Sequence, residues 1–183
     1  MRRLLAVCTA LTCAAAVTHA AVVIPADLSE LTSEARAIVH GRVVATDAHW
    51  VDGRRSIETL VTVQVDDTLK GQARREITFR VPGGQMGPYR SFMVGAPLFE
   101  PGDEIVVFLG AQGPAIPHVL GFNQGVYRVS ADAVGSRRVI SGAALASGHA
   151  AERQVRGAPG REPQTLDRFL EQVRTLVRDG AAR

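Results

Sequence analysis

Histidines are the first residues in this sequence that could do chemistry, because they bind metals and transfer protons near neutral pH. Four follow the first twenty residues: His40, His49, His118 and His149. They are scattered, and none has a cysteine or carboxylate partner at the spacing of a metal site. We therefore expect no metal and no cofactor, and we predict hydrogen-bonded structural roles for His40 and His118.

Two acidic pairs, Asp66-Asp67 and Asp103-Glu104, could act as acid and base. Adjacent strand residues point to opposite faces, so we interpret both pairs as solvated turn positions. The sequence contains no G-x-S-x-G, H-E-x-x-H, Walker A or Rossmann glycine motif. We predict no catalytic residue and a protein that is not an enzyme; a hydrolase with an unrecognised site is the less favoured alternative.

The strongest candidate for binding is the segment 83–99, GGQMGPYRSFMVGAPLF. Long loops in compact domains are often functional, and tyrosine, arginine and methionine suit binding surfaces. We predict a partner-binding surface at the tip, around the turn Gly87-Pro88, and expect Leu98 and Phe99 to fold back into the core. The alternative is that the glycines and prolines only route the chain. The predicted binding residues are Gln85, Met86, Tyr89, Arg90 and Phe92.

Three arginine pairs, at 54–55, 74–75 and 137–138, raise the question of nucleic-acid binding. The aromatic residues of the predicted strands occupy core-like positions, which leaves no stacking platform for bases. Without Arg2 and Arg3 the chain has 19 basic and 18 acidic residues, so its formal charge is +1. We expect solvated arginines at strand ends and no nucleic-acid partner.

The elements that position these residues are mainly β-strands. Residues 37–51 and 57–65 read as a long hairpin around Asp52-Gly53, because β-branched residues alternate along the second strand. Gly41 is typical of a strand bend or bulge, although a plain meander is the alternative. The pattern predicts a third strand at 77–81, an edge segment at 91–94 and a strand buried on both faces at 105–109.

Further along, residues 118–122 and 126–130 read as a second hairpin, and 137–140 as an edge strand. Asp27 can cap a short helix over 27–35. A C-terminal helix is predicted from a cap at Thr165 to a stop at Gly180, with an apolar stripe that docks on the barrel. That stripe comprises Leu166, Phe169, Leu170, Val173, Leu176 and Val177.

Residues 1–20 have the pattern of a cleaved signal peptide: Arg2-Arg3, an apolar run over 4–17 and a small residue at Ala20. Both cysteines, Cys8 and Cys13, lie within it. We expect an exported protein, periplasmic or extracellular, without disulfides or a membrane span. The predicted organisation is a signal peptide (1–20), a barrel domain (21–142), a flexible linker (143–163) and a helix (164–179).

The short helix, the strand Ala37–Val43 and the return ending in Leu69-Lys70-Gly71 resemble the start of the netrin-like or TIMP-like OB-fold. The later segments 94–97 and 101–109 are similar to those of uncharacterised secreted bacterial proteins. The resemblance covers residues 27–130 and implies a mainly β protein, a small Greek-key (OB-like) barrel of five strands.

One departure limits what this resemblance implies. TIMP proteins inhibit metalloproteases through an N-terminal cysteine that chelates zinc, whereas the predicted mature chain starts at Ala21 and has no cysteine. We therefore expect the fold without that inhibitory mechanism. The favoured function is an exported, non-catalytic binding module for a protein or an envelope component, and the alternative is a structural or accessory protein of the envelope.

Overall fold

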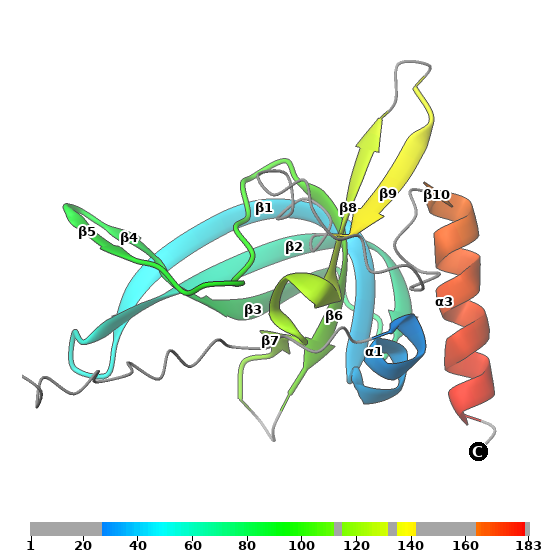
Figure 1. Ribbon diagram of the computed structural model, residues 1–183, viewed down its shortest axis with the longest axis horizontal. Helices are drawn as coiled ribbons and strands as arrows, with labels where there is room; N and C mark the ends of the chain where they lie inside the picture. The colour runs from blue at the N-terminus through cyan, green and yellow to red at the C-terminus, as the bar shows by residue number, and fades with distance from the viewer. Residues whose placement is uncertain (1–26, 112–114, 132–134, 142–163, 182–183) are drawn as a thin grey trace, which may run out of the picture.

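Two long strands, β1 (Ala37–Val51) and β2 (Ser56–Lys70), form an antiparallel hairpin that curves along the molecule (Figure 1). Their pairing extends from Ile38 opposite Lys70 to Val51 opposite Ser56. Asp52, Gly53 and Arg54 all have positive φ in the turn. The predicted hairpin is confirmed, and β2 ends at Lys70, where the sequence places the end of the return strand.

The computed structural model describes residues 27–111, 115–131, 135–141 and 164–181. The predicted signal peptide (1–20) and linker (143–163) lie outside these residues, as does His149. The remaining elements, in chain order, are α1 (Leu28–Glu34), β3 (Glu76–Pro82), β4 (Gly84–Met86), β5 (Tyr89–Ser91), β6 (Glu104–Gly110), β7 (His118–Val119), η1 (Phe122–Gly125), β8 (Val126–Ala131), β9 (Arg137–Ser141), β10 (Gln164–Thr165) and α3 (Leu166–Ala181).

Five strands close into a barrel in the order β1-β2-β3-β7-β6, with β6 pairing back onto β1. The β3–β7 contact is parallel and consists of a single register position, Arg80 opposite His118. The other pairings of the barrel are antiparallel. This mixed closure confirms the predicted mainly β fold, a small Greek-key (OB-like) barrel with a short N-terminal helix and a C-terminal helix.

A bulge at Gly41 lies where β1 pairs with two neighbouring strands, β2 and β6. The register of the β1–β2 ladder shifts between His40 and Gly41, and a Cβ atom at Gly41 would lie 2.1 Å from the carbonyl oxygen of Gln64. Residues 37–42 of β1 pair with β6, whereas the rest of the strand continues only with β2. The bend predicted at Gly41 is therefore confirmed as a bulge.

The predicted hairpin between residues 118–122 and 126–130 is wrong. Both β7 and β8 lie along the same edge of β6, with Val119 opposite Leu109 and Val126 opposite Val107. The chain between them leaves the sheet because Gly121 and Phe122 adopt left-handed backbone conformations and start the short 3₁₀ helix η1. Residues 123–125, between the two predicted strands, therefore lie in a local helical turn and do not form a hairpin turn.

Strand β6 has a core on each of its faces, as its continuous apolar run predicts. Ile105, Val107 and Leu109 point into the barrel and are fully buried with Phe79. Val106 and Phe108 point outward, where the two helices cover them. The barrel interior and the helix-covered layer are thus two separate apolar clusters, and β1, β2, β6 and β8 each supply residues to both.

The two helices lie side by side on the outer face of the barrel (Figure 1). The Asp27 carboxylate caps α1 by accepting a hydrogen bond of 2.7 Å from the Glu30 amide, as expected. Four stripe residues of α3 are buried, and the Phe169 ring packs 4.6 Å from that of Tyr127. Docking of the helix on the barrel is therefore confirmed.

The end of α3 differs from the prediction. The Gly180 backbone does not adopt the positive φ that a helix-ending glycine usually has. The helix therefore continues through it to Ala181. An ion pair of Arg174 with Asp67 on β2 also fixes the helix to the barrel. No helix in the described part of the chain is long and apolar enough to cross a membrane.

Candidate functional site

The segment 83–99 contains a small hairpin, β4–β5, held against the outer half of β1–β2. Thr59 donates a hydrogen bond of 2.7 Å to the Gly83 carbonyl, and the Gly83 amide donates one of 2.9 Å to the Ile57 carbonyl. Gly87 and Pro88 form the turn, as predicted. The strand expected at 91–94 lies instead at 89–91, because this turn pairs Met86 with Tyr89 and Gly84 with Ser91.

The five residues predicted to bind a partner lie on this hairpin and just after it. Gln85 and Arg90 are exposed and Met86 is half-buried, while Tyr89 and Phe92 are 60% and 68% exposed. Tyr89 is not isolated, because its ring packs edge-on against Trp50 with centroids 5.5 Å apart. The hairpin tip is therefore attached to the end of β1.

Trp50, on β1, contacts the tip of the β4–β5 hairpin, and the sequence did not predict this contact. The Arg54 guanidinium lies 5.8 Å from the centroid of its ring, so Arg54, Trp50 and Tyr89 form one cluster from two hairpins. Nothing in the local sequence of Trp50 signals that position, because the contact depends on how β4–β5 folds back over β1–β2.

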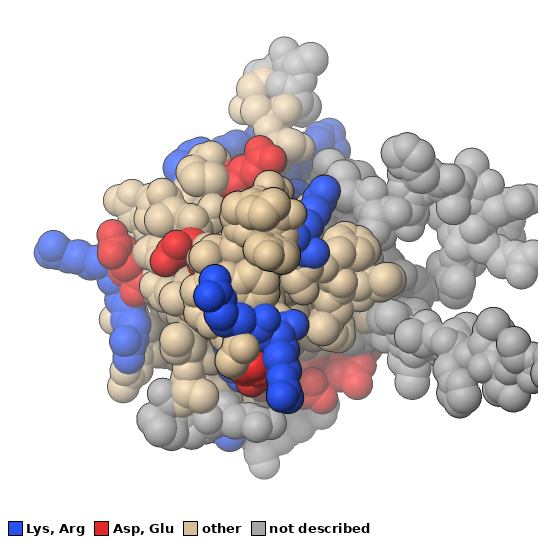
Figure 2. All heavy atoms as spheres, turned by 90° about the vertical axis from the view of Figure 1, so that its left-hand side faces the viewer, with Lys and Arg blue, Asp and Glu red and all other residues tan. Residues whose placement is uncertain are grey.

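Exposed apolar side chains gather in the same segment. Five of the eight large hydrophobic residues exposed in the described chain lie between 89 and 98, and we call these five the apolar rim: Tyr89, Phe92, Met93, Val94 and Leu98. Exposed large hydrophobic residues normally lie singly over a protein surface, so five of them in one short segment are unusual. Figure 2 faces the two hairpin tips and shows uncharged side chains over the middle of that face, with cationic side chains among them.

The prediction for Leu98 is wrong, while that for Phe99 is correct. Leu98 is 63% exposed, whereas Phe99 packs on Phe79 at 5.4 Å and joins the barrel core. The two neighbouring side chains therefore point in different directions, Leu98 to solvent and Phe99 to the core. Arg128 fixes this arrangement, since it donates to the Leu98 carbonyl and lies over the Phe99 ring.

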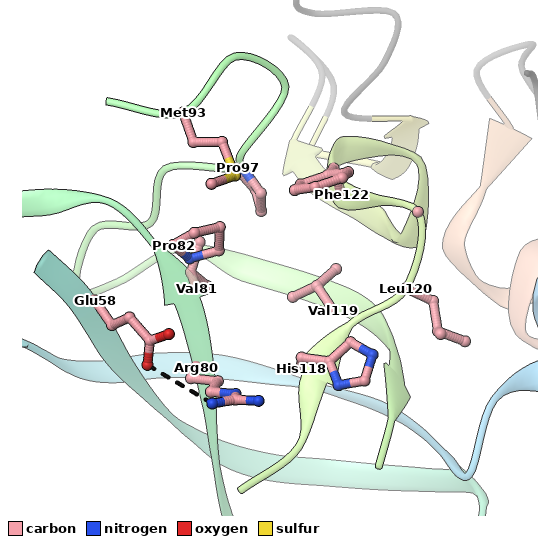
Figure 3. A pocket seen from close by; sticks show the side chains of 11 residues that line it. Glu58, Arg80, Val81, Pro82, Met93, Pro97, His118, Val119, Leu120 and Phe122 are labelled. Carbon is pink, nitrogen blue, oxygen red and sulfur yellow. Dashed lines mark ion pairs between the residues drawn. The ribbon is translucent and has the colours of Figure 1, made fainter. Parts of the chain in front are cut away.

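A pocket of about 410 Å³ opens beside the rim, where β3 and β7 diverge. Figure 3 shows Met93, Pro97 and Phe122 on one side and Glu58, Arg80 and His118 on the other. Most of the wall is apolar, as in ligand sites with a few placed polar groups. The remaining lining residues are Val81, Pro82, Val119, Leu120 and Gly121.

The polar side of the pocket consists of three side chains. Arg80 Nη1 lies 3.9 Å from Glu58 Oε2, which makes an ion pair too long for a hydrogen bond. His118 lines the pocket opposite Arg80, and the hydrogen-bonded structural role predicted for it stays a prediction. The parallel β3–β7 pairing brings Arg80 and His118 together from 38 positions apart, which strand patterns could not predict.

The other predicted structural histidine, His40, is buried and bonded. Its Nε2 atom lies 2.8 Å from Glu104 Oε1, so the prediction for His40 is confirmed. Burial, with Arg137 and Arg42 nearby, lowers the pKa of His40 below its usual 6.5 against the opposing effect of Asp66 and Asp67.

The interpretation of Asp103-Glu104 as solvated is wrong. The Glu104 side chain is only 12% exposed and pairs with Arg42, Arg137 and His40. Asp103 accepts a hydrogen bond of 2.6 Å from Arg128. Both carboxylates therefore form ion pairs within the protein. No group of three metal-ligating side chains occurs among the residues that the structure describes. This cluster closes the barrel and is separate from the pocket.

Neither protein-family models nor curated proteins match this chain. The barrel, the apolar rim and the pocket are therefore the observations from which a function has to be argued.

Proposed function

We propose that this protein is a non-catalytic binding module that engages a partner protein through the apolar rim. The observation that carries the proposal is the concentration of five exposed large hydrophobic residues within ten positions. Exposed apolar patches rimmed by polar residues mark interaction sites on soluble domains. The resemblance of residues 27–130 to netrin-like barrels agrees with a binding role.

The way the rim is held also supports the proposal. Hydrogen bonds from Thr59 and Gly83 fix one end of the segment, and Arg128 fixes the other end at Leu98. Exposed aromatic and apolar side chains on a scaffold-fixed segment lose little entropy on binding. Tyrosine and arginine, here Tyr89 and Arg90, are enriched among residues that dominate binding energy.

The titratable groups whose pKa burial lowers lie away from the pocket. Catalytic acids and bases usually have a shifted pKa and lie in a cleft. Among the described residues the pKa is lowered at His40 and Lys70, in both cases chiefly by burial. Neither residue lines the pocket, which has the Glu58–Arg80 ion pair on its wall.

We further propose that the protein acts outside the cytoplasm, on the strength of the signal-like pattern of residues 1–20. The partner is then another exported protein or a protein of the cell envelope. Intact-mass analysis of the exported protein tests this part. A chain beginning at or near Ala21 supports it, and a mass that retains residues 1–20, or that carries lipid on Cys13, contradicts it.

The experiment for the binding proposal compares three immobilised proteins exposed to a periplasmic or medium extract from the producing cells. We expect the wild type to retain one stoichiometric partner, and Phe92→Ser/Leu98→Ser to lose it while keeping the wild-type melting temperature. Val44→Ser is the matched control, because Val44 is 42% exposed but lies on β1 outside the rim. Equal retention by the wild type and the double variant overturns the proposal, and co-sedimentation with cell wall alone favours a structural envelope protein.

A further inference from the structure

The pocket beside the rim has a composition that points to one kind of occupant. We propose that it receives one large apolar side chain from an extended segment of the partner, while Arg80 and Glu58 bond the backbone of that segment. This inference rests on the proposed function and adds the chemistry of the bound segment.

The apolar walls define the side-chain part of the site. Met93 and Phe122 lie on opposite sides of the opening with Pro97 between them, and Pro82 and Val119 lie below them in the view (Figure 3). Phe122 is 44% exposed and Met93 46%, so both retain apolar surface that a ligand could cover. A volume of about 410 Å³ is at the small end for ligand pockets, which suits a single residue and its adjoining backbone.

The polar wall defines the backbone part. Glu58 can only accept hydrogen bonds and Arg80 can only donate them. Their separation of 3.9 Å leaves both without a hydrogen bond to each other, and their side chains are 27% and 44% exposed. A peptide backbone presents a donor and an acceptor in alternation, which matches this pair.

The charges on the pocket wall argue against a free anion as the occupant. Glu58, Arg80 and His118 are the only titratable side chains in the lining, and the first two cancel each other. A carboxylate bound at Arg80 would lie close to the Glu58 carboxylate and would be repelled by it. A neutral amide meets no such penalty.

Pro82 limits how the pocket can bind the backbone of the partner segment. It ends β3 at the pocket and lacks an N–H group, so this stretch of the edge cannot donate to an added strand. Side chains must therefore make the hydrogen bonds. Met93 lines the pocket and also belongs to the apolar rim, so a segment that crosses the rim reaches the pocket directly.

The test is an NMR titration of the folded protein with three small probes. N-acetyl-L-phenylalaninamide carries the side chain and both amides, 3-phenylpropionate carries the ring with a carboxylate, and N-acetyl-L-alaninamide carries the amides alone. We expect saturable shifts at the amides of residues 119–122 with the first probe. Binding of each of the other two is expected to be weaker by about tenfold, the factor that one well-made hydrogen bond or a few buried methylenes provide.

Two variants keep the result falsifiable. Val119→Trp, which fills the pocket, is expected to abolish the shifts. Arg80→Gln, at a side chain that is 44% exposed, is expected to weaken binding of the phenylalaninamide and of alaninamide alike, because both present the amides that Arg80 bonds. Phe92→Ser, a rim variant, is expected to leave the titration unchanged. No binding of the phenylalaninamide, or equal or tighter binding of phenylpropionate, overturns the inference. Probe binding in a protein whose Phe92→Ser/Leu98→Ser variant still retains the partner overturns the proposed function alone.

Discussion

The Nε2 atom of His40 on β1 lies 2.8 Å from Oε1 of Glu104 on β6, at the seam where the barrel closes. Arg42 from β1 and Arg137 from β9 pair with the same carboxylate. One glutamate therefore connects three strands, and the strand that carries it supplies residues to both apolar cores. Glu104, whose side chain is 12% exposed, is the centre of the charged groups at this seam.

Replacing Glu104 with glutamine is expected to destabilise the protein by about 1.5–3 kcal/mol, the usual value of hydrogen bonds to charged groups. Chemical denaturation measures the loss. Glu171→Gln is the matched control, since Glu171 also pairs with two arginines but is 60% exposed, and such pairs contribute less than about 1 kcal/mol. Equal effects of the two substitutions would show that the seam needs no charge at position 104.

The stability of the protein is expected to fall as the pH drops below about 6.5. Burial lowers the pKa of His40 in the folded protein, so the unfolded chain takes up the proton first and protonation favours unfolding. The contribution of His40 is therefore fully present above 6.5 and is lost as the pH falls toward the folded-state pKa. Denaturation curves at a series of pH values should show a steeper slope for the wild type than for His40→Gln. Parallel slopes would contradict the assignment to His40.

Gly41→Ala should destabilise the barrel by several kcal/mol or prevent folding. The added methyl group would lie 2.1 Å from the Gln64 carbonyl oxygen and 2.9 Å from Val63 Cγ1, so the backbone of the bulge would have to move. Gly180→Ala is the control, because it adds the same methyl group to α3 with no atom within 4 Å. Helix propensity predicts that this control gains up to about 1 kcal/mol. A mild Gly41→Ala variant would mean that the bulge is not needed.

Phe169→Ala is expected to cost about 3–5 kcal/mol, because the ring is fully buried against Tyr127. Arg168→Ala, an exposed neighbour on the same helix, is expected to change the stability by less than about 0.5 kcal/mol. The melting temperatures of the two variants give the comparison. An unchanged melting temperature for Phe169→Ala would show that α3 does not dock in solution.

Local pattern predicted the elements well because most of them bury one face. Alternation along Ile57–Val65, the continuous apolar run of β6 and the stripe of α3 each report burial directly. Local pattern failed where the chain leaves the sheet. Gly121 and Phe122 both take left-handed backbone conformations, and a phenylalanine gives no signal for that choice.

The candidate site was only partly predictable for a related reason. Tyr89 and Phe92 lie in one glycine-rich segment, so the sequence of that segment is enough to predict that both are exposed. Arg80, His118 and Trp50 reach the site through barrel closure and hairpin folding, which depend on pairings between distant strands. Glu104 was misjudged because its partners His40 and Arg137 are 64 and 33 residues away.

The most direct test of the binding proposal is photo-crosslinking in the producing cells. A photo-reactive phenylalanine analogue at position 92 is expected to give one discrete adduct with a partner protein, and the same analogue at position 44 to give none. Adding Tyr89→Ala and Arg90→Ala should abolish the adduct at 92 without altering the fold. No adduct at position 92, an adduct of equal yield at position 44, or an adduct that survives both alanine substitutions would contradict a partner surface at the apolar rim.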